Sequence, residues 1–315
     1  MTDTKIILKA EPNVVKTWED FKKENAPFAI ALDGYVKGKT QCDVKGPYQN
    51  FNHHEEVDRL FTRSTCSQVQ IGMKQGLFNL FSRDNRPYAE VYVNDPDQDT
   101  CLAVWLLRNP DKVLRVEDKI INRLIQLEDL LDATGGTYPV SPSDSMMKKI
   151  AWIFENYTNA RMKNSLHKIS PSDMGKIIDD TGRRISDYWF GRGDEIDLDR
   201  RYEEIYKDNY FTMIKEVGPY ARNKLAEDGI NVYVMANKRE DGNFSYVIGR
   251  ISPYVDYFDH REISKALNEK EGIQEKGNAD SWGGGSTIIG SPRVKGSQIN
   301  PDEMQKILSG IFLKK

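Results

Sequence analysis

The sequence predicts an α/β fold with a mostly parallel sheet and flanking helices, a helical middle, and a second, smaller α/β domain. Two observations predict the first part: apolar runs typical of buried strands, at 27–32 and 89–93, end in polar residues, and helix patterns lie downstream of both. A third observation predicts the second domain, because two strand patterns and a helix pattern follow the helix-rich stretch 111–225.

Length and composition bound the class of protein. A chain of 315 residues fits two domains or one large one. A net charge of −3 gives no general attraction to nucleic acid, so we expect no binding of long duplex. No apolar stretch approaches the ~20 residues that span a bilayer, and the N-terminus lacks a signal-peptide pattern. The widely spaced Cys42, Cys66 and Cys101 argue for reduced thiols, so we expect a cytoplasmic protein without a membrane partner.

The change of pattern along the chain predicts three segments. Residues 1–190 would form a metal-binding α/β domain with a helical extension. Residues 191–229 would form a linker with a helix, and residues 230–315 would form the small domain.

The first domain is predicted to contain a buried strand at 27–32 that ends at Asp33. Functional groups in open α/β sheets lie at such carboxyl ends. Further along, residues 65–78 have the pattern of an amphipathic helix, with Ser64 or Thr65 as its cap.

A second strand, at 89–93, leads to Asp95, and an apolar helix is predicted at 100–107. Asp97 and Asp99 would lie at or before the start of this helix, where the helix dipole favours negative charge. They are therefore either metal ligands or only caps.

The helical middle includes a charged stretch with Leu and Ile periodicity at 116–132. Its acidic cluster at 128–132 either faces a site or forms an ordinary solvated helix face.

The small domain is predicted to begin with strands at 231–236 and 244–251, with Asp241-Gly242 as a turn signal between them. A helix near 261–267 follows, and the chain closes on a helix at 301–313.

The histidine pair His53-His54 holds two of the four histidines of the chain. Imidazole is the commonest metal-binding side chain. With the surrounding aspartates the pair makes a mixed nitrogen and oxygen ligand set, which suits manganese, magnesium or iron. Parallel strands would bring these residues to one edge of the sheet. We predict a metal site formed by Asp33, His53, Asp95, Asp97 and Asp99.

The glycine run Gly283-Gly284-Gly285-Ser286 predicts a loop that binds an anion through backbone N–H groups, because no Cβ blocks a close approach. Arg293 would supply the counter-charge. The alternative is a flexible glycine loop.

Cys66 could pair with a histidine as a thiol–imidazole dyad, or it could pack inside its helix as a small apolar side chain.

These residues resemble the motifs of the DHH phosphoesterase superfamily. The segment 51–54 (Phe-Asn-His-His), followed by the helix start at 63–69, resembles the third motif. Asp33 at a strand end resembles the second motif, and Asp95 resembles the fourth. The order of strands, helix and glycine run at 231–300 resembles the small domain that accompanies many members.

The chain departs from that pattern at three places. Asn52 replaces the leading aspartate, Ser286 replaces the histidine after the glycines, and no Asp-x-Asp motif precedes Asp33. The run 95–99 (Asp-Pro-Asp-Gln-Asp) is such a motif but lies downstream of the histidines. Either it supplies the missing ligands in a rearranged site, or the metal centre is incomplete.

The resemblance implies a metal-dependent phosphoesterase that hydrolyses a small phosphodiester or a short oligonucleotide with metal-activated water. It implies one or two Mn²⁺ ions, with Mg²⁺ as the alternative, and it implies that His54 lies beside the scissile phosphate. The glycine run, with Ser286 and Arg293, would bind a second phosphate or a nucleotide. A homodimer is compatible with the sequence.

Two other interpretations stay open. The missing first motif and Asn52 motivate a catalytically inactive protein of the same fold that binds or senses nucleotides. The third interpretation is an α/β protein in which the histidine pair is incidental.

Overall fold

The computed structural model describes residues 4–114, 118–252, 254–274 and 280–314. The chain divides into two compact units. The first comprises residues 1–57, 61–133 and 143–197, and the second comprises residues 58–60, 134–142 and 198–315. The prediction of an α/β fold is confirmed, because both units combine helices with a β-sheet.

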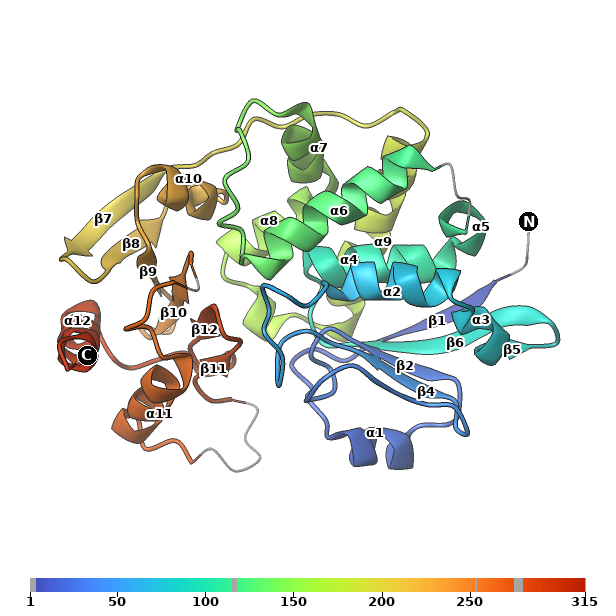
Figure 1. Ribbon diagram of the computed structural model, residues 1–315, viewed down its shortest axis with the longest axis horizontal. Helices are drawn as coiled ribbons and strands as arrows, with labels where there is room; N and C mark the ends of the chain where they lie inside the picture. Colours follow the sequence, from blue (N-terminus) through green and yellow to red (C-terminus); the bar gives the residue numbers. More distant parts are fainter. Residues whose placement is uncertain (1–3, 115–117, 253, 275–279, 315) are drawn as a thin grey trace. The chain divides into compact units, whose positions relative to one another are not determined.

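The first unit contains a sheet with helices on both faces (Figure 1). Its strands are β1 (Lys5–Ala10), β2 (Ala29–Leu32), β3 (Gln41–Asp43), β4 (Tyr48–Phe51), β5 (Ser82–Arg83) and β6 (Arg86–Val93). Its helices are α1 (Trp18–Glu24), α2 (Thr65–Lys74), α3 (Leu77–Leu80), α4 (Gln98–Arg108), α5 (Pro110–Val113), α6 (Lys119–Ala133), α7 (Ser145–Ile153), α8 (Glu155–Met162) and α9 (Pro171–Trp189), with a 3-10 turn at Leu166–Lys168.

The sheet of this unit is mixed, so the prediction of a mostly parallel sheet is wrong. The strand order is β1-β6-β2-β4-β3, and the neighbours among β1, β6, β2 and β4 pair in parallel. Strand β3 pairs antiparallel with β4, and β5 pairs antiparallel with β6.

Short connections explain the antiparallel pairs. Only a few residues separate β3 from β4, and a parallel pair would need a crossover of a dozen or more. Strands β5 and β6 are joined by Asp84 and Asn85, which both have positive φ, at 51° and 57°. Two such residues form the tight turn that is typical of a two-residue β-hairpin.

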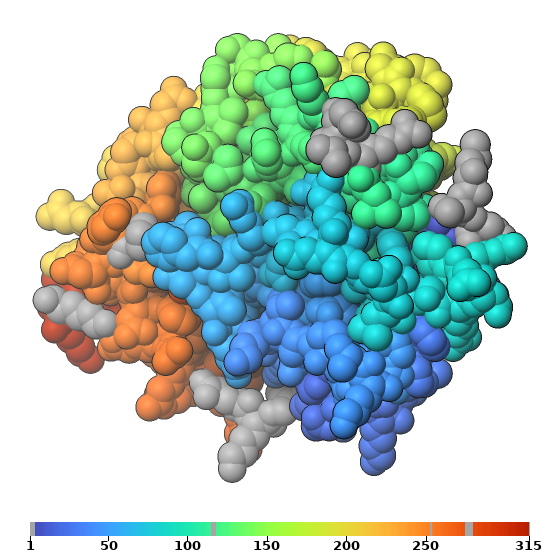
Figure 2. All heavy atoms as spheres, turned by 45° about the vertical axis from the view of Figure 1, so that its right-hand side comes forward, coloured from blue at the N-terminus to red at the C-terminus, as the bar shows by residue number. Residues whose placement is uncertain are grey.

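Alternate residues of β2 pack against opposite faces of the sheet, as in any strand. Ala29 and Ala31 contact a cluster that includes Phe21 of α1, and all three are fully buried. The helices α2, α4 and α9 lie on the other face (Figure 1). On the face visible in Figure 2, the blue, cyan and green segments of this unit pack side by side.

The second unit contains its own mixed sheet, in the order β11-β12-β10-β9-β8-β7. Among the described strand pairs of this second sheet, β8–β9 is parallel and the others are antiparallel. Its elements are β7 (Tyr202–Lys207), β8 (Thr212–Glu216), α10 (Ala221–Glu227), β9 (Val232–Lys238), β10 (Phe244–Arg250), α11 (His260–Lys270), β11 (Gly283–Gly284), β12 (Ile288–Gly290) and α12 (Pro301–Phe312).

Both faces of the second sheet are apolar. On one face Val234 and Ile248 pack in the cluster that includes side chains of α11 and α12. On the other face Tyr233 and Met235 pack with Leu225 of α10. Strands buried on both faces lack a simple alternation of polar and apolar residues, which is why residues 232–236 (Val-Tyr-Val-Met-Ala) form a continuous apolar run.

Most predicted elements are present with shifted ends. The strand at 27–32 is β2, the helix at 65–78 is α2 followed by α3, and the strand at 89–93 is the end of β6. The helix predicted at 116–132 corresponds to α6, and residues 116 and 117 lie outside the described residues.

The segment 191–229, predicted as a linker with a helix, contains more structure than that. Residues 198–229 hold β7, β8 and α10 and belong to the second unit. A short turn at 208–211 joins β7 to β8. Asp208 Oδ1 accepts hydrogen bonds from Tyr210 N and Phe211 N and so stabilises this turn.

Within the described part of the chain, no helix combines the length and the apolar character that crossing a bilayer requires.

The contact of α1 with the sheet gives a stability prediction. Phe21 is fully buried, and its ring lies 5.9 Å from that of Tyr35 and 5.5 Å from that of Tyr92 between centroids. We expect Phe21→Ala to lower the free energy of unfolding by about 3–5 kcal/mol, because it leaves a cavity in this core. Urea denaturation measures the change.

The control is Phe61→Ala, because Phe61 is 83% exposed. Its effect should stay within about 0.5 kcal/mol. Equal effects of the two substitutions would show that α1 does not contribute a packed core.

Candidate metal centre

The candidate metal centre lies at the carboxyl ends of the parallel strands of the first unit. Strands β6, β2 and β4 are adjacent and parallel, so their carboxyl ends meet at the same edge of the sheet. Asp33 directly follows β2, and His53 and His54 come just after β4. The structure places the histidine pair within hydrogen-bonding or ion-pair distance of this strand-end aspartate.

Asp33 contacts both histidines with one oxygen. Its Oδ1 lies 2.8 Å from His54 Nε2 and 3.4 Å from His53 Nε2. The side chains of Asp33 and His53 are almost completely buried, whereas that of His54 is 26% exposed. The pair therefore has one buried imidazole and one that reaches solvent.

Two further carboxylates approach the buried imidazole. His53 Nε2 lies 2.8 Å from Asp132 Oδ2, on α6, and 3.8 Å from Asp99 Oδ2, on α4. Together the contacts define two groups whose ligand atoms lie within 4.8 Å of one another, and both include His53. The groups are Asp33 with His53 and His54, and His53 with Asp99 and Asp132.

These two groups could hold a divalent metal ion. Ligands at about 2.1 Å from an octahedral ion are about 3 Å from their neighbours, and the distances between the ligand atoms here are 2.8, 3.4 and 3.8 Å. Imidazole nitrogen with carboxylate oxygen is a donor set for manganese, magnesium or iron.

Asp99 also caps helix α2. Its two oxygens accept hydrogen bonds from Thr65 N at 2.6 Å and Cys66 N at 2.7 Å, which are among the N–H groups that a helix start leaves unsatisfied. The Thr65 hydroxyl in turn donates to Asp33 Oδ1 at 2.9 Å. The start of α2 is thus tied to two carboxylates of the cluster.

Asn52 holds the histidine pair in place. Its side-chain amide donates to Val36 O at 3.2 Å and Gly38 O at 2.7 Å, and its carbonyl accepts from His54 N at 3.1 Å. A carboxylate could not donate to these carbonyl groups. The residue that departs from the DHH pattern therefore has a structural role of its own.

The electrostatics of the cluster depend on its histidines. Burial would raise the pKa of Asp33, but His54 and His53 outweigh it and hold that pKa well below its usual range. Burial, then the charges of Asp132 and Asp33, raise the pKa of Asp99 to about 7. Burial, then Asp33 and Asp95, raise the pKa of Asp97 well above its usual range. A cation would relieve this repulsion between carboxylates.

The thiol–imidazole interpretation of Cys66 finds no support. Cys66 is fully buried, and burial, followed by the charges of Asp99 and Glu128, raises the pKa of its thiol well above the usual range. A nucleophilic cysteine needs a lowered pKa. Cys66 packs as an apolar side chain.

The other predicted ligands, Asp95 and Asp97, lie beside the cluster. Neither belongs to the groups found among the described residues. Asp97 is the N-cap of α4, and its Oδ1 accepts from Thr100 N at 2.8 Å. Of the two alternatives for these acids, ligand or helix cap, the cap describes Asp97. Asp99 both caps the start of α2 and approaches His53.

The glycine run belongs to the second unit, and part of it is paired backbone. Gly283 and Gly284 form β11 against β12, and a Cβ on Gly284 would lie 2.3 Å from Ile288 O. Ser286 Oγ accepts from the backbone N of Arg59 at 3.4 Å. Gly285 is buried, and Arg293 is exposed, with its carbonyl accepting from Arg239.

The sequence left open whether the acidic cluster at 128–132 faces a site. In the structure Glu128 is buried on the face of α6 that carries Ile121, Leu124 and Ile125, and the Asp132 side chain is 15% exposed. Glu128 follows Ile125 by three residues and Asp132 follows Glu128 by four, and this helical spacing is the signal that could have identified them. Burial, then Asp132, raises the pKa of Glu128 well above its usual range.

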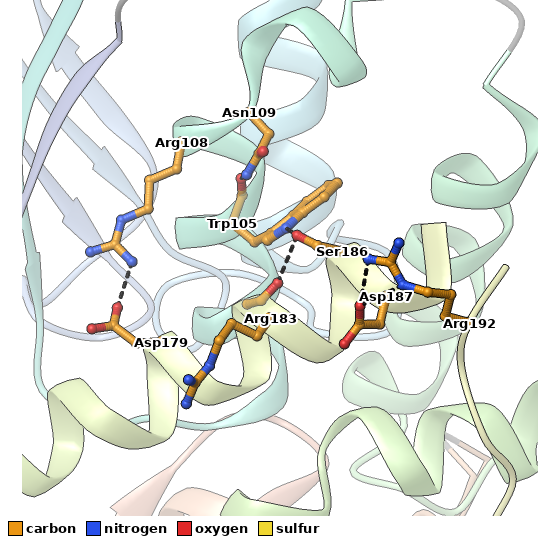
Figure 3. Close-up of a pocket in the computed structure, with 9 residues that line it drawn as sticks. Trp105, Arg108, Asn109, Asp179, Arg183, Ser186, Asp187 and Arg192 are labelled. Carbon is orange, nitrogen blue, oxygen red and sulfur yellow. Dashed lines mark hydrogen bonds and ion pairs between the residues drawn. The ribbon is translucent and has the colours of Figure 1, made fainter. Parts of the chain in front are cut away.

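A separate hollow of about 450 Å³ lies between α4 and α9 (Figure 3). Its arginines are paired: Arg108 lies 2.7 Å from Asp179, and Arg192 lies 2.8 Å from Asp187. The guanidinium groups in Figure 3 do not converge on one point. The hollow lies at the carboxyl end of α4, whereas Asp99 of the candidate metal centre lies at its start, so the hollow is a different place.

Compared with known protein families and with curated proteins, the sequence has no match. The interpretation of the site therefore depends on the residues themselves.

The role of Asn52 can be tested by restoring the aspartate of the DHH pattern. We expect Asn52→Asp to lower the free energy of unfolding by about 2–4 kcal/mol, because two buried carbonyl groups lose their donor and face a carboxylate. Urea denaturation measures the effect. The control is Asn109→Asp, which removes a single side-chain bond to Trp105 O. Tighter metal binding by Asn52→Asp without destabilisation would contradict this role.

The raised pKa of Asp99 predicts how the stability of the metal-free protein depends on pH. A carboxyl with a raised pKa contributes stability at low pH that is lost as the pH rises from about 3.8 through about 7. At about 1.4 kcal/mol per pH unit the loss is at most about 4 kcal/mol. The protein in EDTA should therefore unfold at less urea at pH 8 than at pH 5.5.

Saturating Mn²⁺ should remove most of this difference, because the cation stabilises the ionised carboxylates. Asp99→Asn should flatten the pH dependence in EDTA. A metal-free protein that is more stable at pH 8 would contradict the assignment.

Proposed function

We propose that this protein is a metal-dependent phosphoesterase that hydrolyses a small phosphodiester or a short oligonucleotide. One observation carries the proposal: His53 and His54 meet Asp33, Asp99 and Asp132 in a buried cluster at the carboxyl edge of parallel strands. Hydrolytic metal centres need several nitrogen and oxygen ligands from separate segments, and this cluster draws them from two strand ends and two helices.

The residues of the cluster would have two roles, metal binding and substrate contact. A bound Mn²⁺ or Mg²⁺ would supply activated water and polarise a phosphoryl oxygen. Asp33 and His53 belong to the buried part of the cluster and would hold the ion with Asp132. His54, with its 26% exposed side chain, is the residue of the pair that can reach a substrate and donate a hydrogen bond.

The positions of the strands support a divergent DHH-like arrangement. In the DHH pattern, an Asp-x-Asp motif precedes the strand-end aspartate that Asp33 resembles. Here the motif 95–99 follows β6, which is the parallel neighbour of β2. Adjacent strand ends can supply the same ligands in a different chain order, so the motif can serve the site despite its place in the sequence.

The second unit is proposed to contribute to substrate binding through Gly283 to Ser286 and Arg293. Gly283 and Gly284 are both exposed, although both are paired with β12 as strand β11. The substrate is proposed to be small because the net charge of −3 gives no general attraction to long duplex.

A second candidate function is a catalytically inactive protein that binds nucleotides. Two observations favour it. Both oxygens of Asp99 are engaged by the start of α2, and Asp97 caps α4, so two acids of the motif have structural roles. Asn52 likewise acts as a donor to backbone carbonyl groups.

Metal binding and hydrolysis test the proposal together. We expect the wild type to bind Mn²⁺ and to release p-nitrophenol from bis(p-nitrophenyl) phosphate. Asp132→Asn and His53→Gln should each weaken Mn²⁺ binding at least 10-fold and lower kcat at least 100-fold, because each removes a ligand. Electron paramagnetic resonance of free Mn²⁺ measures the first quantity.

The control is His260→Gln, at the start of α11 in the second unit, which should bind Mn²⁺ like the wild type. Mn²⁺ binding without any hydrolysis, together with intact nucleotide binding, would favour the inactive alternative. Absence of Mn²⁺ binding by the wild type would contradict both the metal centre and the phosphoesterase.

A further inference from the structure

We infer that Arg63 is a substrate-binding residue that contacts a phosphoryl oxygen of the substrate at the edge of the metal centre. The inference rests on the proposed phosphoesterase function and adds a residue to it. Three observations support it. Arg63 lies next to the cluster along the chain, a buried carboxylate anchors its guanidinium, and this anchor leaves other hydrogen-bond donors of the guanidinium available.

Arg63 lies beside the cluster along the chain. It precedes Ser64, the N-cap of α2, and stands two residues before Thr65, whose hydroxyl donates to Asp33 Oδ1. Two residues span at most about 7 Å between Cα atoms. The reach of an arginine side chain is therefore sufficient to bring its guanidinium to a ligand bound at Asp33.

The backbone of Arg63 is fixed relative to the histidine pair. Gln68 Nε2 donates to Arg63 O at 2.8 Å and to Asn52 O at 3.2 Å, so one side chain bridges both segments. The next residue, Ser64, donates its backbone N–H to Asp129 Oδ1 at 2.6 Å. A residue that is held on both sides can present its side chain with a defined direction.

Asp129 anchors the guanidinium near the metal ligands. Arg63 Nη1 lies 2.6 Å from Asp129 Oδ2, and the Asp129 side chain is only 8% exposed. Asp129 precedes Asp132 by three residues on α6, and side chains with this spacing are neighbours on a helix, about 5–6 Å apart at Cβ. Arg63 is therefore anchored on the same helix, α6, that carries the proposed ligand Asp132.

The anchor leaves most of the guanidinium available. An arginine has five N–H donors in a planar fork that matches phosphate, and only Nη1 has a partner among the described residues. The side chain is 67% exposed. An ion pair that served stability alone would contribute little at this exposure.

The charge of the cluster favours a positive residue at its edge. Asp33, Asp99 and Asp132 gather around His53, and their carboxylates would repel a phosphate group. A metal ion offsets part of this charge. A guanidinium at the edge adds a positive group that forms directional bonds to phosphoryl oxygens.

Substitution of Arg63 in the full Mn²⁺-loaded protein tests the inference. We expect Arg63→Gln to raise KM for bis(p-nitrophenyl) phosphate about 10- to 100-fold, since a charged hydrogen bond contributes about 1.5–3 kcal/mol, and to change kcat less. The affinity for inorganic phosphate, measured by calorimetry, should fall by a similar factor. Arg63→Lys should recover part of both losses.

The matched control is Arg108→Gln, because Arg108 also pairs with an aspartate through Nη1, at 2.7 Å, but lies at the hollow between α4 and α9. It should leave KM and phosphate affinity unchanged. A wild-type KM and phosphate affinity in Arg63→Gln, or equal losses in both variants, would overturn the inference while the metal-dependent activity stands. If the wild type neither binds Mn²⁺ nor hydrolyses the substrate, the proposed function itself fails.

Discussion

The buried carboxylate of Asp33 is the interaction on which the candidate site depends. One oxygen meets His53, His54 and the Thr65 hydroxyl, so the end of β2, the loop after β4 and the start of α2 are held together by a single group. A buried anion is costly unless it is paired and hydrogen-bonded. These partners compensate its burial, and with Asp33 the two histidines form one of the groups that could hold a metal ion.

The concentration of acids around this group is the second constraint. Asp97, Asp99 and Glu128 all have raised pKa values because burial and neighbouring carboxylates disfavour their charged forms. A fold does not gain stability from such a cluster by itself. Perturbed acids that gather beside two histidines are typical of a functional site, and a divalent cation is the partner that would stabilise them.

Helix starts and side-chain amides determine the geometry of the cluster. The N–H groups at the start of α2 bind the carboxylates of Asp99 and Asp129, and Asp99 also belongs to a group that could hold a metal ion. The amide of Asn52 binds the loop after β2 to the histidine pair. The departure from the DHH pattern at this position is thus compatible with a well-ordered site, because it exchanges a charge for two donated hydrogen bonds.

The α/β class and the strand before Asp33 could be predicted from the sequence, and so could the expectation that Asp33 lies beside the histidine pair, because these follow from local periodicity and from strand ends. The antiparallel edges, the paired glycines of β11 and the contact of Asp132 with His53 could not be predicted in this way. Asp132 is 79 residues from His53 by their numbers, and the contact requires α6 to pack with its acidic turn toward the sheet edge. Periodicity can say that a helix face is buried, but the partner of that face is chosen by packing among segments distant in sequence.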